Sequence, residues 1–218
     1  AGEEGLAALE QAERTARADY EDRAHALSVQ RQDAAALLDK AVAGELAPLK
    51  LDAAKFCTNI EPLTESQWGP QGMDRVEFLI ATNPGAPFAP LTKIASGGEL
   101  SRFILALKVA LAEQGGTQTM IFDEIDRGVG GAVASAIGER LARLAENGQV
   151  IVVTHSPQVA ARGGSHMLIA KSSEGTVTRT DVKLLDEAGR REEIARMLSG
   201  ADITAEARAQ ADRLLEGV

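Results

Sequence analysis

The sequence has few of the features that stabilise a small secreted protein or anchor a protein in a membrane. It contains one cysteine, Cys57, in 218 residues, which excludes an internal disulfide. No apolar run near its beginning has the length of a signal peptide or a membrane helix, so we expect a cytoplasmic protein with no membrane segment. Basic residues number 23 against 32 acidic ones, for a net charge of −9. That sign argues against a surface that binds nucleic-acid phosphates throughout.

Proline is absent before Pro48, and the composition changes at that point. Residues 6–46 are rich in Ala, Glu, Arg, Gln and Leu, which favours one long helix. Heptad a and d positions counted from Leu6 give a mostly apolar seam at 6, 9, 13, 16, 20, 23, 27, 30, 34, 37 and 41. This seam predicts a coiled coil whose second strand lies outside this chain, and an amphipathic helix lying on the domain is the alternative. We therefore divide the chain into a coiled-coil arm, 1–48, and a lobe, 49–218.

After Pro48 the pattern is that of a mixed α/β lobe. Alternating residues predict strands at 55–60 and 75–80, joined as a hairpin by a long polar loop. The proline-rich stretch 83–90 is expected to lack regular structure. Short apolar runs at 118–122 and 150–154 each follow a predicted helix, as buried parallel strands do. The remaining expected elements are a helix closed by Asn147-Gly148, strands at 167–170 and 176–184, and helices at 190–198 and 204–215.

Residues 96–99 predict a helix start that can bind an anion. Ser96 is a good N-cap, and Glu99 stands at the capping-box spacing. Gly97 and Gly98 let bare amides and the positive end of the helix dipole approach a phosphate closely. A capped helix without a ligand is the alternative. The helix is expected to end at Gly115-Gly116 and to present one apolar face made of Leu100, Phe103, Ile104, Leu107 and Leu111.

Two carboxylates follow the apolar run at 118–122. Asp123 and Glu124 would lie at the mouth of a parallel sheet, where open α/β folds bind ligands. Asp123 suits Mg²⁺, directly or through a water, because this ion prefers hard oxygen ligands. Glu124 would activate or position the water that attacks the γ-phosphate of ATP. Apolar runs that end in acidic residues are common, so a purely structural role is the alternative.

His155 ends the next predicted strand and would donate to the γ-phosphate, although a lone histidine is more often a satisfied polar residue. The order of the elements carries more weight: glycine turn, helix, carboxylate-ended strand, helix, histidine-ended strand. This is the order of an ATP-hydrolysing head. The G-x-x-x-x-G-K-[ST] loop that holds the β- and γ-phosphates is missing, and no lysine directly follows a glycine. The sequence therefore predicts half of an ATPase.

Several segments resemble the motifs of ABC-type ATPases. Residues 96–99 are similar to the signature motif, 120–124 to the Walker B strand, 126–131 to the D-loop and His155 to the switch histidine. Lobes of this type with a coiled-coil arm occur in the SMC, Rad50 and RecN group. Within that group, the runs 93–102, 122–131, 153–161 and 191–200 resemble the RecN family of bacterial DNA repair proteins.

The resemblance implies an α/β fold: the C-terminal lobe of an ABC-type ATPase head, with a mainly parallel sheet flanked by helices and an N-terminal coiled-coil helix. It implies ATP and Mg²⁺ as cofactors. Catalysis would fall to Glu124 and His155 and metal binding to Asp123. The nucleotide contacts implied are Ser96, Gly97, Gly98, Glu99 and Asp126.

The partners implied are the N-terminal Walker A half of the same protein, a second head in an ATP-dependent homodimer, and DNA through the full assembly. Such a protein would be nucleoid-associated and would hold DNA ends during double-strand break repair, with this half inactive when isolated. A head of another SMC or Rad50-like protein and a non-catalytic docking half-head remain alternatives. A transporter nucleotide-binding domain would normally carry Walker A upstream in the same segment and lack the arm.

Overall fold

A computed structural model of the chain describes residues 2–94, 96–111, 119–174 and 177–217. It forms two compact units, Ala1–Gly44 with Ala53–Ile94 and Glu45–Asp52 with Ala95–Val218. The long helix α1 (Gly2–Leu46) enters both, because its last two residues belong to the second unit. This division differs from the arm and lobe expected from the sequence, since residues 53–94 join most of α1.

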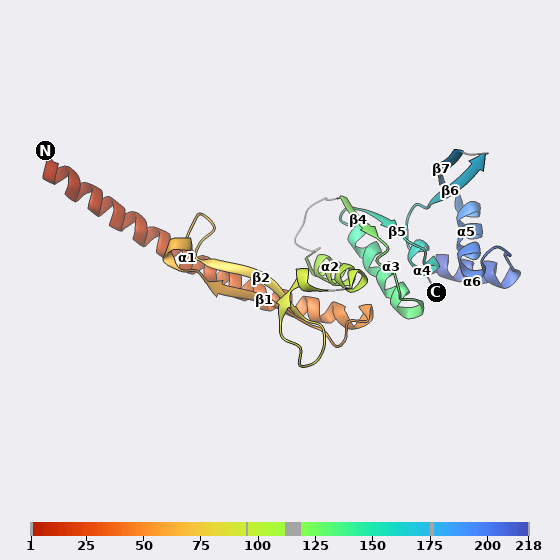
Figure 1. The fold of residues 1–218 in the computed structure, drawn as a ribbon, viewed down its shortest axis with the longest axis horizontal. Coiled ribbons are helices and arrows are strands. Elements are labelled where there is room, and N and C mark those ends of the chain that lie inside the picture. Colours follow the sequence, from red (N-terminus) through yellow and green to blue (C-terminus); the bar gives the residue numbers. More distant parts are fainter. Residues whose placement is uncertain (1, 95, 112–118, 175–176, 218) are drawn as a thin grey trace. The chain divides into compact units, whose positions relative to one another are not determined.

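The first unit combines α1 with an antiparallel hairpin (Figure 1). Strands β1 (Lys55–Pro62) and β2 (Asp74–Ala81) pair from Lys55↔Ala81 to Pro62↔Asp74, which confirms the predicted hairpin with its long loop. A two-residue strand, β3 (Ala89–Pro90), pairs with β2 in the stretch expected to be irregular. Proline is tolerated there because β3 is at the sheet edge. Short 3₁₀ turns complete the connections at Ala47–Leu49, Glu65–Gln67 and Leu91–Lys93.

Polar side chains fasten α1 to this hairpin. The Asp74 carboxylate, only 6% exposed, accepts hydrogen bonds from Ser28 Oγ at 2.7 Å and from Arg31 Nη1 at 3.0 Å. The Tyr20 hydroxyl donates to the carbonyl of Gly69 at 3.0 Å. These bonds lie on one side of α1 and fix which face of the helix meets the strands.

The predicted seam of α1 is largely exposed. Leu6 and Leu37, both seam residues, are 59% and 72% exposed. Ala24, Ala35 and Val42 are buried instead, each one residue beyond a predicted seam position. The expected register therefore does not describe the packing of α1 within this chain, because the hairpin engages the neighbouring face. That a second helix packs on the exposed seam to form a coiled coil stays a prediction.

The second unit contains a parallel β-α-β element. Strands β4 (Thr119–Asp123) and β5 (Gln149–Val153) pair in parallel, and α3 (Gly131–Ala145) connects them, as predicted. Strands β6 (Met167–Glu174) and β7 (Val177–Leu184) form a separate antiparallel ribbon. The other helices of this unit are α2 (Gly97–Leu111), α4 (Pro157–Ala160), α5 (Glu187–Ser199) and α6 (Ala205–Glu216).

The face that α2 buries shares only Phe103 with the predicted one. Its buried residues are Arg102, Phe103, Leu105, Ala106 and Val109. Two members of the predicted face, Ile104 and Leu111, are 38% and 39% exposed. Nearly every position from 103 to 111 is apolar, so the pattern does not single out one face. The predicted helix end at 115–116 lies outside the described residues.

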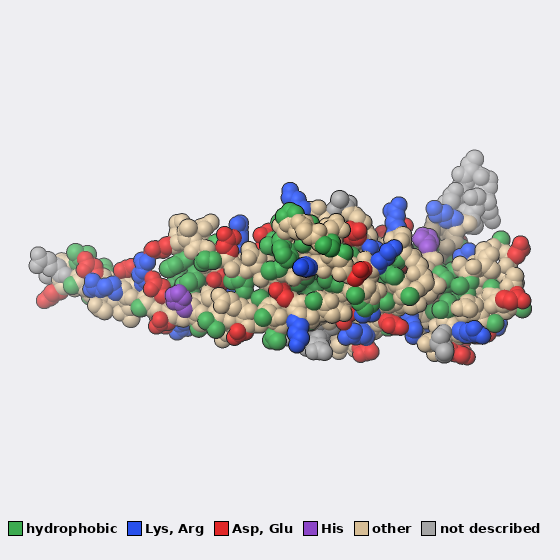
Figure 2. Space-filling view, turned by 90° about the horizontal axis from the view of Figure 1, so that it is seen from below, with side chains coloured by type: hydrophobic (Ala, Val, Ile, Leu, Met, Phe, Trp, Pro, Cys, Tyr) green, Lys and Arg blue, Asp and Glu red, His purple; other side chains and the backbone are tan. Residues whose placement is uncertain are grey.

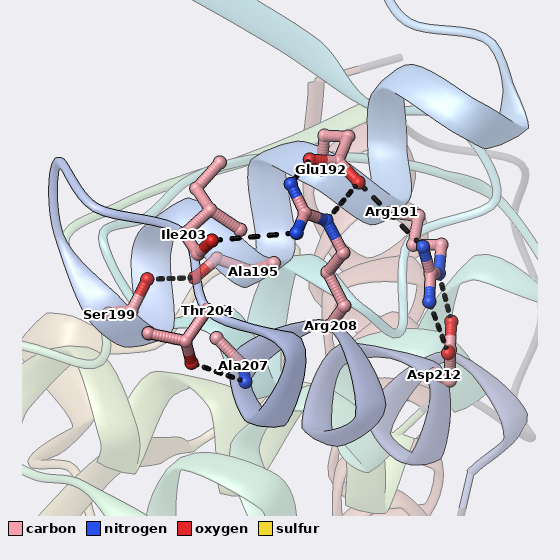
Figure 3. Close-up of polar contacts among 9 residues, drawn as sticks. All are labelled: Arg191, Glu192, Ala195, Ser199, Ile203, Thr204, Ala207, Arg208 and Asp212. Atoms are coloured by element: carbon pink, nitrogen blue, oxygen red, sulfur yellow. Dashed lines mark hydrogen bonds and ion pairs between the residues drawn. The ribbon is translucent and has the colours of Figure 1, made fainter.

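Helices α5 and α6 pack as an antiparallel pair, confirming both helices predicted near the end of the chain. Thr204 caps α6 by accepting from the amide of Ala207 at 3.1 Å. Two ion pairs cross between the helices: Arg191 with Asp212 at 2.5 and 2.7 Å, and Arg208 with Glu192 at 2.8 and 3.0 Å (Figure 3). The buried residues between them are Ala161, Ile194, Ala195, Ala207 and Ala211. Among the helices that the structure describes, none combines the length and apolar composition needed to cross a membrane.

Candidate nucleotide site

The carboxyl ends of β4 and β5 bring three predicted site residues together. Asp123 pairs with Val153 in the parallel ladder, and the amide of Glu124 donates to the carbonyl of Val153 at 3.0 Å. His155 follows β5 by two residues, and its Nε2 atom lies 4.0 Å from Glu124 Oε1. The sheet thus places two carboxylates and an imidazole at one edge, where α/β sheets bind ligands.

Glu124 occupies a left-handed backbone conformation. Its φ is +47°, and the amide of Arg127 donates to its carbonyl at 3.0 Å to close a turn. A residue with a Cβ pays about 1 kcal/mol or more for this conformation. The guanidinium of Arg127 lies 3.5 Å from Glu124 Oε2 and restrains the carboxylate. Backbone strain of this kind clusters at functional sites because the surrounding structure must hold it.

Asp126 ties the loops after β4 and β5 to each other. It is 7% exposed, and its Oδ2 atom accepts a hydrogen bond from Thr154 Oγ1 at 2.6 Å. The amide of Ser156 in turn donates to Thr154 Oγ1 at 2.9 Å. The other carboxylate oxygen of Asp126, Oδ1, is buried and has no hydrogen-bond partner in the described part of the chain. Asp126 is therefore a structural link, and its nucleotide contact stays a prediction.

A cavity of about 410 Å³ lies between these loops. It is lined by Glu124, residues 126–129, His155 and Ser156. The cavity is an open depression, since the side chains of Arg127 and His155 in its lining are 79% and 88% exposed. The lining offers an imidazole and a guanidinium as donors beside the carboxylate proposed to handle water, which is a set of groups suited to a phosphate and its attacking nucleophile.

The turn formed by Ser96, Gly97 and Gly98, called the signature turn from here on, lies beside the loop that follows β4. Ser96 Oγ accepts from the amide of Glu99 at 3.4 Å, as expected for an N-cap. A Cβ placed on Gly98 would lie 3.4 Å from the carbonyl oxygen of Arg127, so the turn packs against the loop after β4. Ser96 and Gly97 are exposed, which leaves the start of α2 open to an anion.

Of the two carboxylates at this sheet edge, Asp123 is the one expected to hold magnesium. Asp123 is exposed at the end of β4, and no group of three His, Cys, Asp or Glu side chains converges as a metal cage within the described residues. Mg²⁺ is commonly held by one or two carboxylates together with waters and substrate phosphates. Asp123 therefore fits a magnesium ion that arrives with a nucleotide.

Two residues of the site were missed from the sequence. Thr154 gave no signal beyond being polar at a strand end. Arg102 gave none either: it stands three, four and seven residues before Leu105, Ala106 and Val109, but only the structure shows that these three are buried, because nearly every position from 103 to 111 is apolar. A charged residue on the buried face of a helix either has a partner that offsets the cost of burying its charge or serves a function.

The chain was compared with known proteins. No family model matches it. The DNA repair protein RecN of Xylella fastidiosa is 45% identical over 193 residues, which cover 88% of this chain and 35% of that protein. RecN of Streptomyces coelicolor is 45% identical over 216 residues, covering 94% and 38%. The chain is RecN-like.

The RecN-like chain spans little more than a third of the length of the curated relatives it matches. Its fold is similar to the Smc head domain of Pyrococcus furiosus with an extended coiled coil, at a TM-score of 0.55 and 18% identity, covering 89% of this chain and 45% of that one. The Smc head of Pyrococcus yayanosii gives a TM-score of 0.52 at 18% identity, covering 74% and 29%. The predicted fold, a half of an SMC-like head with a long N-terminal helix, is confirmed.

Proposed function

We propose that this RecN-like chain is the C-terminal half of an ATPase head that works in the repair of DNA double-strand breaks. The observation that carries the proposal is the convergence of Asp123, Glu124 and His155 at the carboxyl ends of β4 and β5, with the signature turn beside the same loop. Nucleoid association and DNA-end holding belong to the full assembly and depend on this head activity.

Each residue has a distinct task in this proposal. Glu124 holds the attacking water or takes its proton, and His155 donates to the γ-phosphate. Ser96, Gly97 and Gly98 present amides and a hydroxyl to ATP held by a second head. Mg²⁺ bound through Asp123 would offset the charge of the phosphates. Glu99 orders the first turn of α2 by donating its amide to Ser96.

Exposed apolar residues indicate where the missing half belongs. Ile121 and Ile151 are neighbours in the β4–β5 ladder, yet they are 70% and 46% exposed. Val153 is 39% exposed on the same pair of strands. Parallel strands normally have both faces covered, so this surface fits a second lobe. We propose that the N-terminal half, which would supply the G-x-x-x-x-G-K-[ST] loop, covers it.

Reconstitution tests this function. The chain alone should not hydrolyse ATP, because the groups present would contact mainly the distal phosphate and the metal. Mixed with the N-terminal half of the same protein, it should co-purify with that half and turn over ATP. Turnover by the chain alone that survives a further purification step would contradict the proposal, and co-purification without turnover would support a docking half-head instead.

ATP-dependent dimerisation of the reconstituted head provides a second test. Replacing Ser96 with Arg should block ATP-dependent dimers of the reconstituted head, because the long cationic side chain fills the space that the partner's nucleotide needs. Each head should still bind ATP with unchanged affinity. Light scattering measures the dimer, and dimers of normal strength in Ser96→Arg would remove the signature turn from the shared site.

A further inference from the structure

Arg102 is a charged residue at a core position. It is 6% exposed, and its Nε atom has no hydrogen-bond partner among the residues that the structure describes. Burial lowers the pKa of Arg102 below its usual value, and Glu99, one turn earlier, partly offsets this. A guanidinium nevertheless keeps its charge in a protein. An apolar side chain of similar size would pack there without the cost of burying a charge. The charge of Arg102 is therefore expected to have a function beyond packing.

The guanidinium of Arg102 lies behind the signature turn. The point where Gly98 would carry a Cβ is 3.4 Å from Arg102 Nη1 and also 3.4 Å from the carbonyl oxygen of Arg127. Arg102 and the loop after β4 therefore flank the same glycine. The residue before Arg127, Asp126, has a buried carboxylate oxygen that also lacks a described partner.

We propose that Arg102 is a positioning residue that couples the signature turn to the loop carrying Glu124 and Asp126. No hydrogen bond joins Arg102 to that loop among the described residues, but Arg102 and the Arg127 carbonyl are both neighbours of Gly98, and the rigid fork of five N–H donors can donate to that carbonyl. A phosphate that contacts Ser96, Gly97 and Gly98 then draws the turn, Arg102 and the loop together. The functional part of this inference rests on the proposed ATPase head, but the coupling itself is a property of this chain.

Hydrogen exchange of the isolated chain tests the coupling without any nucleotide. In Arg102→Gln, the amides of Arg127 and Val129, which donate to the carbonyls of Glu124 and Asp126, should exchange at least about tenfold faster. The amides of residues 105–109 in α2 should keep their rates, because a merely structural defect would loosen the helix as well. Arg213→Gln, which removes the same charge from an exposed position on α6, is the matched control. Unchanged rates at Arg127 and Val129 would overturn the inference.

ATP-dependent dimerisation of the reconstituted head then tests the consequence in a Glu124→Gln background, where hydrolysis is expected to be slow. Adding Arg102→Gln should weaken ATP-dependent dimers at least about tenfold while ATP binding to each head stays within twofold. Arg102→Lys, which keeps the charge and loses the fork, should recover part of the loss, and its melting temperature shows whether the fold survives. Full-strength dimers in Arg102→Gln with Glu124→Gln would overturn the inference. Failure of Glu124→Gln alone to dimerise would overturn the proposed function, while the exchange result still decides the coupling.

Discussion

Glu124 combines the proposed catalytic carboxylate with a strained backbone, at φ +47°. Glycine adopts this region without the steric cost that a Cβ imposes. We predict that Glu124→Gly has a free energy of unfolding about 1 kcal/mol higher than Glu124→Ala, the reverse of the order at an ordinary helical position. Urea unfolding of the isolated variants measures this difference. If the alanine variant is the more stable, the turn after β4 stores no strain.

The chemical role of Glu124 is tested in the reconstituted head. Glutamine keeps the size and hydrogen bonding of glutamate but removes the charge that orients or deprotonates water. Glu124→Gln should therefore retain ATP binding and lose about 10²–10⁴-fold in turnover. Steady-state rates and ATP affinity give the two readouts. A near-normal rate would be incompatible with the role given to Glu124.

Asp123→Ala tests the metal ligand in the same reconstituted head. If the dependence of ATP turnover on magnesium concentration is unchanged in this variant, Asp123 does not bind the metal.

Helix α2 begins with two glycines that its own fold does not require. Neither has a positive φ, and a Cβ on Gly97 would meet nothing within 4 Å. Alanine favours a helix over glycine by up to about 1 kcal/mol. We predict that Gly97→Ala stabilises the isolated chain by about 0.5 kcal/mol, since first-turn positions gain less, and weakens ATP-dependent dimers at least about tenfold because the methyl group holds phosphate away from the amides.

Gly44 provides the matched control for this prediction. It lies in α1, is exposed, and would carry a Cβ with nothing within 4 Å. Gly44→Ala should give a similar gain in urea unfolding with dimerisation unchanged. Equal dimerisation in Gly97→Ala and Gly44→Ala would show that the glycine turn serves only the helix.

The ion pairs between α5 and α6 predict how stability depends on pH. The Arg191 guanidinium lowers the pKa of Asp212, and the Arg208 guanidinium lowers the pKa of Glu192. A carboxyl with a depressed pKa in the folded state stabilises the fold above its unfolded pKa and loses that contribution as pH falls through the folded value. The free energy of unfolding should therefore drop below about pH 4.

Substitution of both carboxyls tests this dependence. Asp212→Asn with Glu192→Gln should flatten the decline in urea unfolding measured at successive pH values, whereas Asp202→Asn, at an exposed position, should follow the parent chain. An identical pH profile in the double variant would show that the pairs in Figure 3 add nothing to stability.

Helix positions were easier to predict than the faces by which helices pack. In α3, Ile137, Leu141 and Leu144 stand at helical spacing among small and charged residues, which leaves one apolar stripe, and all three are buried. In α2 apolar residues occur on every side, so the pattern could not choose between Ile104, which was predicted and is exposed, and Leu105, which is buried. In α1 the choice depends on a hairpin that is distant in the chain, which no local period contains.

At the scale of the whole molecule, the order of the motifs predicts that Asp123, Glu124 and His155 share one site, and the carboxyl ends of β4 and β5 bring the three residues together. What the order did not contain was Arg102 behind Gly98, because a contact between α2 and the loop after β4 depends on tertiary packing. The missing phosphate loop predicted half of a head. That prediction agrees with a chain spanning little more than a third of its RecN relatives.

The charge of the whole chain predicts weak binding to DNA. The net charge is −9, and on the face shown in Figure 2 the basic side chains are interspersed with acidic ones. Three arginines of α1 that would otherwise be candidate contacts are already paired. Arg17 lies 2.7 Å from Glu65, Arg23 lies 3.0 Å from Asp19, and Arg31 lies 3.0 Å from Asp74. A phosphate would have to displace a carboxylate at each of them.

We therefore predict that this chain binds duplex DNA with a dissociation constant of about 10⁻⁶ M or weaker at about 0.15 M salt, with a shallow salt dependence. The slope matters as much as the affinity, because log K falls by roughly 0.9 per decade of salt for each phosphate contacted. Titration of labelled duplex across a salt series gives both numbers. Arg14→Gln, in the same arm, where the Arg14 guanidinium donates to Gln11 Oε1 at 3.3 Å, should leave both unchanged if α1 makes no DNA contact. Nanomolar binding with a steep slope would instead place a basic DNA-binding surface within this half-head, and the arm and dimer would no longer be needed to explain the DNA holding proposed for the full protein.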